Sequence, residues 1–405
     1  MDKCILIISG GIEAAEAARR AKQMGLFVVV SDRDARAPGF AFADSCLLAD
    51  VYGPEETAAA AERFNRKVRR IDGVICVAAD APLTTALVAE RLGLPGIDSK
   101  SARLACDKMA MKRCFAAKGV PVPWFKEVAT LQELQRIVIE RGPDLVIKPV
   151  DSRGSRGVQR LARVADLSQA FLFARAHSPS QRVMVEEYLS GPQLSTESLI
   201  CDGRTYTPGL SDRNYEYLDR FAPYFVENGG DLPSQLPIVQ QAKVKDVVHR
   251  AAAALGIRNG TVKGDIVVHQ GEPYVIELAA RLSGGFFCTR EIPLNTGVDF
   301  VGCALRLALG ETITAKDAEP KHLIPVVQRY AFPPPGRIVS IEGADEARAV
   351  AGVEDVVITA RAGDIIASAG DKRPSAAMVL AKGPSREHAL KAANDALACL
   401  RIQTQ

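Results

Sequence analysis

An alternation of strand and helix patterns in the first hundred residues constrains the fold more than any other feature. Residues 4–9 and 27–31 are short β-rich runs, and the alanine-rich stretch between them, residues 12–24, has helical periodicity. Residues 74–78 and 82–92 repeat the strand-then-helix order. This order, with glycines at the first strand-to-helix turn, is typical of a parallel sheet covered by helices. We therefore predict a small doubly wound domain at this end of the chain.

The pattern changes after residue 100. A helix is predicted over residues 101–118, with Asp107-Lys108 near its middle, and strands joined by tight turns follow. Residues 333–336, Pro-Pro-Pro-Gly, form the clearest linker, and a small α+β unit ending in a helix over 385–400 comes after it. The predicted division of the chain is 1–100, 101–190, 191–325 and 326–405.

Composition excludes several classes of protein. The 405 residues contain 51 Lys+Arg against 48 Asp+Glu, so no overall field attracts nucleic acid or an anionic membrane. No apolar run approaches the ~20 residues that a bilayer span needs, and the first hydrophobic stretch is too short for a signal peptide. Nine cysteines without a C-x-x-C pair favour a reducing compartment over disulfides or zinc. We expect a cytoplasmic protein with no nucleic-acid or membrane partner.

A Ser/Arg/Gly loop over residues 151–157 joins two predicted strands directly after Lys148-Pro149. Its backbone N–H groups can fold over phosphates, and Gly154 and Gly157 lack the Cβ atoms that would block close approach. The ammonium group of Lys148 could reach the same phosphates. An exposed basic hairpin is the alternative. A Walker-type loop is excluded because G-x-x-x-x-G-K-[S/T] does not occur.

Two acids are expected to face each other on a second hairpin. If residues 270–272 form a three-residue loop, His269 pairs with Pro273, and Asp265 lies opposite Glu277. Opposed side chains have Cβ atoms ~4.5–5.5 Å apart, so the carboxylates repel unless a cation lies between them. Mg²⁺ held by one or two carboxylates and by substrate phosphates fits this place. A register shifted by one residue would turn one acid to solvent.

Polar groups near these acids complete a candidate site. An arginine beyond a metal carboxylate can neutralise a transferring phosphoryl group or an acyl oxyanion, and a Ser-Gly-Gly turn offers N–H groups to an anion. Two acids at the end of a buried strand suit an adenine-binding hinge. A surface arginine, a flexible loop and a solvated strand end are the alternatives. The residues are Arg281, then Ser283, Gly284 and Gly285, and Glu186 with Glu187.

The order of these features strongly resembles the ATP-grasp superfamily over roughly residues 1–310. The resemblance implies an α/β and α+β architecture: a doubly wound parallel-sheet domain (1–100), a small lobe with the glycine-rich flap (101–190), a large lobe with the metal site (191–325) and a small C-terminal α+β domain (326–405). In that superfamily ATP lies between the two lobes, and its phosphoryl group passes to a carboxylate to give an acyl phosphate that an amine attacks. ATP, Mg²⁺, and small-molecule carboxylate and amine substrates are therefore expected.

The resemblance also implies roles for individual residues. Arg281 is expected to stabilise the acyl-phosphate stage, Asp265 and Glu277 to bind magnesium, and Arg213 to grip a substrate carboxylate unless it is a surface arginine. The turn at residues 283–285 is a further candidate for substrate binding. The residues expected to contact ATP are Lys108, Lys148, Gly154, Ser155, Gly157, Glu186, Glu187, Leu189 and Gln193.

Two departures from the superfamily pattern bear on function. Gln193 stands where many relatives have a ribose-binding Glu, and Ala279 stands where many have a metal-binding Asn. The stretch 277–285, ELAARLSGG, is similar to ATP-grasp ligases that act on amino acids, which favours a carboxylate–amine ligase with an amino-acid-like substrate. A carboxylase, a glycinamide-ribonucleotide-synthetase-like enzyme and a non-catalytic ATP sensor are the alternatives. Relatives are commonly dimers, so a homodimer is one candidate assembly.

Overall fold

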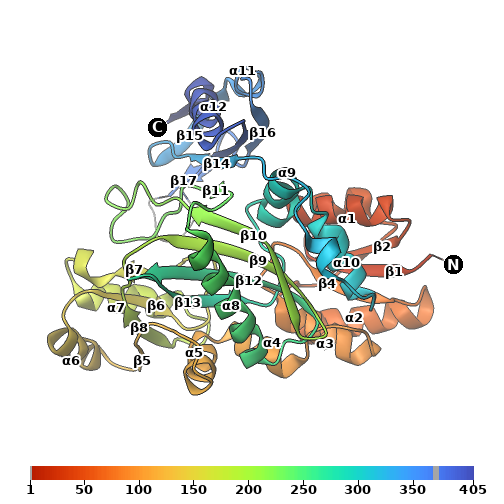
Figure 1. Cartoon of the computed structure of the whole chain (residues 1–405), viewed down its shortest axis with the longest axis horizontal. Coiled ribbons are helices and arrows are strands. Elements are labelled where there is room, and N and C mark those ends of the chain that lie inside the picture. Colours follow the sequence, from red (N-terminus) through yellow and green to blue (C-terminus); the bar gives the residue numbers. More distant parts are fainter. Residues whose placement is uncertain (1, 368–373) are drawn as a thin grey trace.

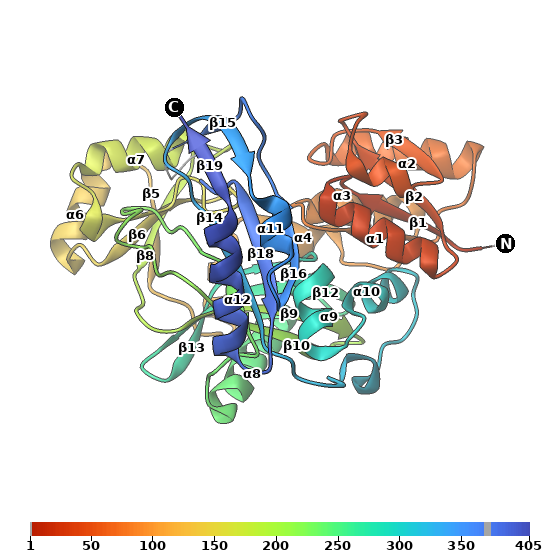
Figure 2. The same ribbon diagram turned by 90° about the horizontal axis from the view of Figure 1, so that it is seen from above.

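The computed structural model describes residues 2–367 and 374–405. One large sheet lies at the centre, with the N-terminal domain beside it, a small lobe on the opposite side and the C-terminal elements above (Figure 1). Figure 2, seen from above, shows the C-terminal elements lying between the small lobe and the N-terminal domain. None of the helices within the described residues combines the length and the apolar character that crossing a membrane requires.

The N-terminal domain is built on a four-stranded parallel sheet with the order β3-β2-β1-β4. On β1, Ile5 and Ile7 pack with α1, whereas Leu6 and Ile8 pack with α2 and α3. Helices cover both faces, because alternate side chains of a strand point to opposite sides. The elements are β1 (Cys4–Ile8), α1 (Ile12–Gln23), β2 (Phe27–Asp32), η1 (Pro38–Phe42), β3 (Ser45–Leu48), α2 (Pro54–Lys67), β4 (Gly73–Cys76) and α3 (Pro82–Leu92).

The helix predicted over residues 101–118 is divided at Asp107, so this prediction was wrong. Asp107 has extended backbone angles (φ −112°, ψ 106°), ends α4 (Ser99–Cys106) and caps α5 (Lys108–Ala117) by accepting a hydrogen bond from Ala110 N–H. An aspartate that satisfies a free N–H group starts a helix more favourably than it continues one. The break places Lys108 at the first position of α5.

The small lobe is an antiparallel sheet with the order β5-β8-β6-β7, and helices α6 and α7 pack on it. Its flap, residues 150–158, joins β6 to β7. The elements are β5 (Phe125–Val128), α6 (Leu131–Arg141), β6 (Leu145–Pro149), β7 (Gln159–Arg160), η2 (Leu161–Arg163), α7 (Leu167–Ala176) and β8 (Val183–Glu187).

The large sheet has eight strands in the order β13-β12-β9-β10-β11-β14-β18-β16. It continues from the large lobe into the C-terminal elements because β11 pairs with β14. Helix α8 packs on it through Val244, Val247 and Val248. The elements are β9 (Gln193–Cys201), β10 (Arg204–Arg213), β11 (Gly230–Leu232), α8 (Ile238–Leu255), β12 (Gly260–His269), β13 (Glu272–Ala279), β14 (Val326–Ala331), β16 (Val353–Ile358) and β18 (Ala377–Lys382).

The hairpin of β12 and β13 pairs Asp265 with Glu277 as predicted, but for a different reason. Its turn has two residues, Gln270 (φ 52°) and Gly271 (φ 82°), and not three, so the predicted pairing of His269 with Pro273 was wrong. A β-bulge between Asp265 and Ile266 adds one residue on β13 and compensates for the shorter turn.

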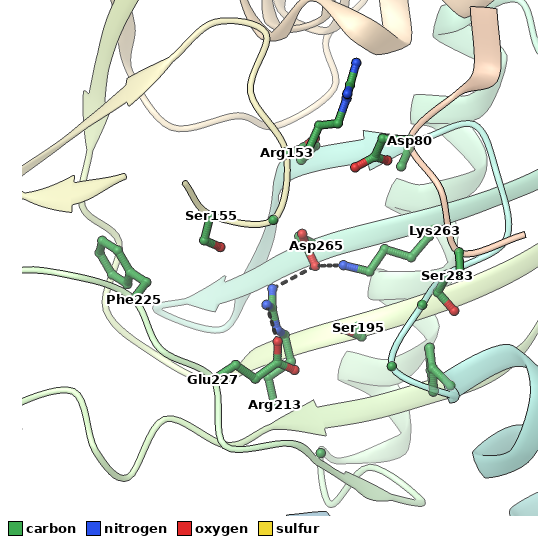
Figure 3. Close-up of a pocket in the computed structure, with 18 of the residues that line it drawn as sticks. Asp80, Arg153, Ser155, Ser195, Arg213, Phe225, Glu227, Lys263, Asp265 and Ser283 are labelled. Atoms are coloured by element: carbon green, nitrogen blue, oxygen red, sulfur yellow. Dashed lines mark hydrogen bonds and ion pairs between the residues drawn. The ribbon is translucent and has the colours of Figure 1, made fainter. Parts of the chain in front are cut away.

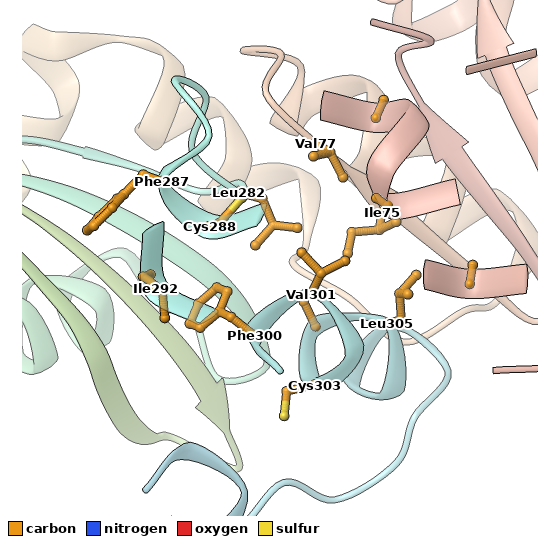
Figure 4. Packing of buried hydrophobic residues seen from close by; sticks show 14 of the residues in the cluster. Ile75, Val77, Leu282, Phe287, Cys288, Ile292, Phe300, Val301, Cys303 and Leu305 are labelled. Carbon is orange, nitrogen blue, oxygen red and sulfur yellow. The ribbon is translucent and has the colours of Figure 1, made fainter. Parts of the chain in front are cut away.

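A core shared by several domains joins the N-terminal sheet to the large lobe. Ile75 and Val77 near the end of β4 pack with Leu282, Phe300 and Val301 (Figure 4). The helical segment on the large-lobe side of this cluster comprises η3 (Phe287–Glu291, one π-helical turn), α9 (Ile292–Thr296), α10 (Phe300–Ala308) and η4 (Ala315–Ala318). The remaining elements are β15 (Gly336–Glu342), α11 (Ala344–Arg348), β17 (Ile365–Ile366), α12 (Arg386–Cys399) and β19 (Arg401–Thr404).

Candidate active site

Two cavities meet at the paired acids of β12 and β13. The first lies between the small and large lobes and has a volume of about 120 Å³; the second lies over the large sheet and has a volume of about 550 Å³. Asp265 and Glu277 line both cavities, as do Arg213 and the flap residues Gly154 and Ser155. The acids therefore stand where a group held in one cavity meets a group held in the other.

The smaller cavity brings together almost all residues expected to contact ATP. Its lining includes Lys108, Lys148, Gly154, Ser155, Glu186, Glu187, Leu189 and Gln193, together with Asp265 and Glu277.

Gly157 has a structural part in the flap. A Cβ atom at Gly157 would lie 2.7 Å from both Pro149 and His177, and its φ is +77°. The residue therefore allows the flap to return against the end of β6.

A buried cluster of three charges includes Lys148 and Glu186, which line the smaller cavity. Lys148 donates to Glu186 at 2.5 Å, and Lys112 forms an ion pair with the same carboxylate at 2.8 Å. Burial raises the pKa of Glu186, but the two ammonium groups outweigh burial, so the pKa is lower than usual. Burial lowers the pKa of Lys112 from 10.5 to about 8. Lys112 was not predicted as a site residue.

The Glu186 carboxylate, expected to accept from adenine, thus already binds two lysines. Its Oε2 atom nevertheless has no aligned hydrogen bond from any described residue, because the Lys112 ammonium contacts it as an ion pair only. A carboxylate oxygen accepts more than one donor, so an amino group in the cavity can still bind there. The structure therefore adds a role for Glu186, as the counter-charge of Lys112 and Lys148.

Basic groups surround the two paired acids. Asp265 accepts from Arg213 at 2.8 Å and also from Lys263 (Figure 3). Glu277 lies 3.3 Å from the Lys108 ammonium. Burial raises the pKa of Asp265, but Arg213 and Lys263 outweigh it and hold the pKa well below its usual range. Asp265 is therefore a charged acceptor at neutral pH.

The donor set fits one magnesium ion that also takes oxygens from a phosphate. Two opposed carboxylates on adjacent strands supply one or two ligands, as Mg²⁺ sites on nucleotides commonly have. Within residues 2–367 and 374–405, no group of three or more His, Cys, Asp or Glu side chains is arranged to hold a metal. The remaining ligands would have to come from the nucleotide and from water.

Arg281 is oriented by the N-terminal domain. Its Nε donates to Asp80 at 2.6 Å, and an isolated parallel bridge pairs Val77 with Leu282 beside it. Burial lowers the pKa of Arg281, but Asp80 outweighs burial and raises it. Asp80 was not predicted as a site residue. It follows β4 at the carboxyl edge of the parallel sheet, where ligand-binding groups commonly lie, so its place after a predicted strand could have identified it.

The turn at residues 283–285 does bind an anion through its N–H groups, but that anion is part of the protein. Glu13 of α1 accepts from the N–H groups of Gly285 (2.9 Å) and Phe286 (2.8 Å), and Ser283 N–H donates to Glu197 (3.1 Å). The expectation that these N–H groups of Ser283 and Gly285 serve a substrate anion was therefore wrong. Ser283, Gly284 and Gly285 still line the wall of the larger cavity.

Arg213, expected to grip a substrate carboxylate, is held between two protein carboxylates. It donates to Asp265 at 2.8 Å and to Glu227 at 2.7 Å (Figure 3), while its buried Nε atom has no acceptor within residues 2–367 and 374–405. Glu227, which was not predicted as a site residue, lies in the segment between β10 and β11. The guanidinium, fixed in this way, lies where the two cavities meet.

The flap also contacts the N-terminal domain. The guanidinium of Arg153 stacks on the ring of Tyr52 at 3.8 Å from the ring centroid, and both residues line the larger cavity. This contact closes one side of the space above the acids.

Family models match three consecutive parts of the chain. They are described as ATP-grasp N-terminal domain (residues 16–96), ATP-grasp domain (105–285) and L-amino acid ligase C-terminal domain 2 (329–405). The crystal structure of L-amino acid ligase from Bacillus licheniformis superposes with a TM-score of 0.84 at 22% identity, covering 100% of this chain and 99% of that one.

Curated relatives match over shorter parts. The uncharacterized protein y4rH of Sinorhizobium fredii is 29% identical over 323 residues, covering 79% of this chain and 65% of that protein. D-alanine–D-alanine ligase of Desulforudis audaxviator is 29% identical over 197 residues, covering 47% of this chain and 63% of that ligase. The chain thus spans less than two thirds of the length of either relative. The domain matches show that the chain contains an ATP-grasp N-terminal domain over residues 16–96 and an ATP-grasp domain over residues 105–285.

Proposed function

We propose that the protein is an ATP-dependent ligase that joins a carboxylate to an amine. The observation that supports it most is the meeting of two cavities at Asp265 and Glu277. The smaller cavity has lysines and a flap suited to a nucleotide, and the larger has room for a second reactant. The similarity to L-amino acid ligase and D-alanine–D-alanine ligase supports the same reaction class.

In the proposed first step, a carboxylate oxygen of the substrate attacks the γ-phosphorus of ATP, and the bond to the bridging β–γ oxygen breaks. ADP leaves with the electron pair, and an acyl phosphate remains. Lys108 and Lys148 would hold the phosphates in line, and Arg281 would balance charge on the transferring group. Little covalent chemistry is required of the protein, so position and charge lower the barrier.

Asp265 and Glu277 are the residues that would hold magnesium. When bound there with ATP, the ion neutralises charge on the phosphate oxygens. Lys108, which contacts Glu277 at 3.3 Å in this structure, would then be released toward the phosphates.

In the second step, an amine attacks the acyl carbon, the acyl–oxygen bond breaks and inorganic phosphate leaves. An acyl phosphate hydrolyses if water reaches it, so the reacting centre must be covered. The flap and its Arg153–Tyr52 contact supply such a cover. We extend the proposal to an amino-acid-like substrate, because residues 329–405 match an L-amino acid ligase domain.

The test is ADP release from Mg-ATP with pools of amino acids and small carboxylates offered alone and with amines. Wild-type protein should release ADP only with certain pools, and Glu277→Ala should abolish that release. The matched control is Glu272→Ala on the same strand, whose exposed side chain pairs with Lys243 outside both cavities. Circular dichroism and melting temperature check that each variant is folded.

Three results would contradict the proposal or part of it. Full activity of Glu277→Ala would remove the metal assignment. Stimulation by bicarbonate alone would identify a carboxylase. Tight ATP binding with no ADP from any pool would support a nucleotide sensor. Sedimentation velocity on the same protein would test the expected homodimer, and cell fractionation the expected cytoplasmic location.

A further inference from the structure

The larger cavity extends across the strands of the large sheet. Its floor carries residues of β12 (Asp265), β9 (Ser195), β10 (Arg213), β11 (Gly230) and β14 (Gln328). These strands are consecutive neighbours, and strands lie ~4.8 Å apart, so β14 is roughly 19 Å from β12. The cavity thus has a reactive end at the paired acids and a remote end beside β11 and β14.

Glu291 stands at the remote end of this cavity. It is the last residue of η3, only 3% of its surface is exposed, and it lines the cavity. Within residues 2–367 and 374–405, its carboxylate has no hydrogen-bond or ion-pair partner, whereas its own N–H group donates to Phe286.

Among the described residues, the charges around Glu291 do not compensate its carboxylate. Glu227, Glu13 and Asp231 are the acids that act on it most strongly, and the one cation among its main electrostatic neighbours within the described residues is Arg329. Arg329 already donates to Asp231 at 2.7 Å. Burial and these acids raise the pKa of Glu291 well above its usual range. A buried carboxylate left in this state is unfavourable unless a cation joins it.

We propose that Glu291 recognises a cationic amine of the substrate, so that the remote end of the cavity is an ammonium subsite. This inference rests on the proposed function for the identity of the cavity as a substrate site. An ammonium group supplies the positive charge and the hydrogen-bond donors that the carboxylate lacks. A neutral hydroxyl or methyl group of the same size supplies no positive charge. It would therefore bind less well beside Glu291 and Glu227, which both line this cavity.

The experiment measures binding by calorimetry in the absence of ATP turnover. The probes are pairs that differ in the amine: L-alanine with L-lactate for an α-ammonium, and L-lysine with L-norleucine for a side-chain ammonium. Wild-type protein should bind the amine member of at least one pair ten times more tightly or better. Glu291→Gln should lose at least tenfold of that preference, and Glu291→Asp, which keeps the charge, should retain part of it.

Glu140→Gln is the matched control, because Glu140 is exposed on α6 and far from the cavity. The melting temperature of Glu291→Gln should equal or exceed that of wild type, since the substitution removes an uncompensated buried acid. Equal binding of both members of every pair by wild type, or an undiminished preference in Glu291→Gln, would overturn the inference.

The two proposals fail separately. An amine preference that depends on Glu291, in a protein that never releases ADP, would leave the subsite standing and contradict the ligase. Substrate-dependent ADP release by a protein whose amine preference does not depend on Glu291 would support the ligase and contradict the ammonium subsite.

Discussion

Replacing Lys112 by methionine tests how the buried charge cluster responds to pH. The ammonium of Lys112 is 1% exposed and shares the Glu186 carboxylate with Lys148. Burial lowers its pKa from 10.5 to about 8, so between these values the folded protein binds fewer protons than the unfolded chain. The free energy of unfolding therefore rises with pH in this window. Below pH ~8 Lys112 is charged in both states and its burial is least favourable.

The magnitude follows from the same two values. A pKa lowered from 10.5 to about 8 corresponds to roughly 3 kcal/mol, of which about 2 kcal/mol should appear between pH ~7.5 and ~10. Methionine fills a similar volume without a charge. The free energy of unfolding of Lys112→Met, taken relative to that of wild type, should therefore be about 2 kcal/mol lower at pH ~10 than at pH ~7.5.

The assay is denaturant unfolding of wild type and Lys112→Met across this pH range. The quantity compared is the difference between their free energies of unfolding. Lys100→Met, at an exposed position of α4, is the control and should show no such change. If the difference between Lys112→Met and wild type stays constant with pH, the ammonium of Lys112 does not titrate in this window and the argument fails.

Two further predictions follow from single contacts. Asp80→Asn removes the charge that orients Arg281. The kcat for ADP release should therefore fall at least tenfold, with little change in KM for ATP. A change in KM alone would show that Arg281 does not act on the reacting group. Gly157→Ala should lower the free energy of unfolding by about 1–3 kcal/mol, because φ at Gly157 is +77° and a Cβ atom there would lie 2.7 Å from Pro149. Gly154→Ala should destabilise the protein less, because a Cβ atom at Gly154 would have nothing within 4 Å. Similar melting temperatures for the two variants would refute this prediction.

Local sequence signals predicted the elements well where the physical cause is local. The strand, helix and strand predicted at residues 4–9, 12–24 and 27–31 are present as β1, α1 and β2, because the apolar periodicity that predicts them follows from local backbone geometry. The break at Asp107 was missed although its cause is also local. An aspartate suits the start of a helix as well as a loop, and the apolar periodicity continued across it.

The pairing of Asp265 with Glu277 shows the limit of counting along strands. The predicted turn was one residue too long, and a β-bulge restored the register. A bulge depends on how neighbouring strands pack and twist, so the sequence of one hairpin does not reveal it.

The β-α-β order of the N-terminal domain, the presence of the hairpins and the residue types around the smaller cavity could be predicted from the sequence, because these depend on periodicity and on turn chemistry between near neighbours. The pairs of charged groups that meet in the folded chain could not be predicted in this way. Asp80 binds Arg281, Glu13 binds the N–H group of Gly285, and Glu291 forms no ion pair with the described side chains, although no short-range pattern links these positions. Such pairings depend on how separate domains pack, and burial then sets the energy of each charge.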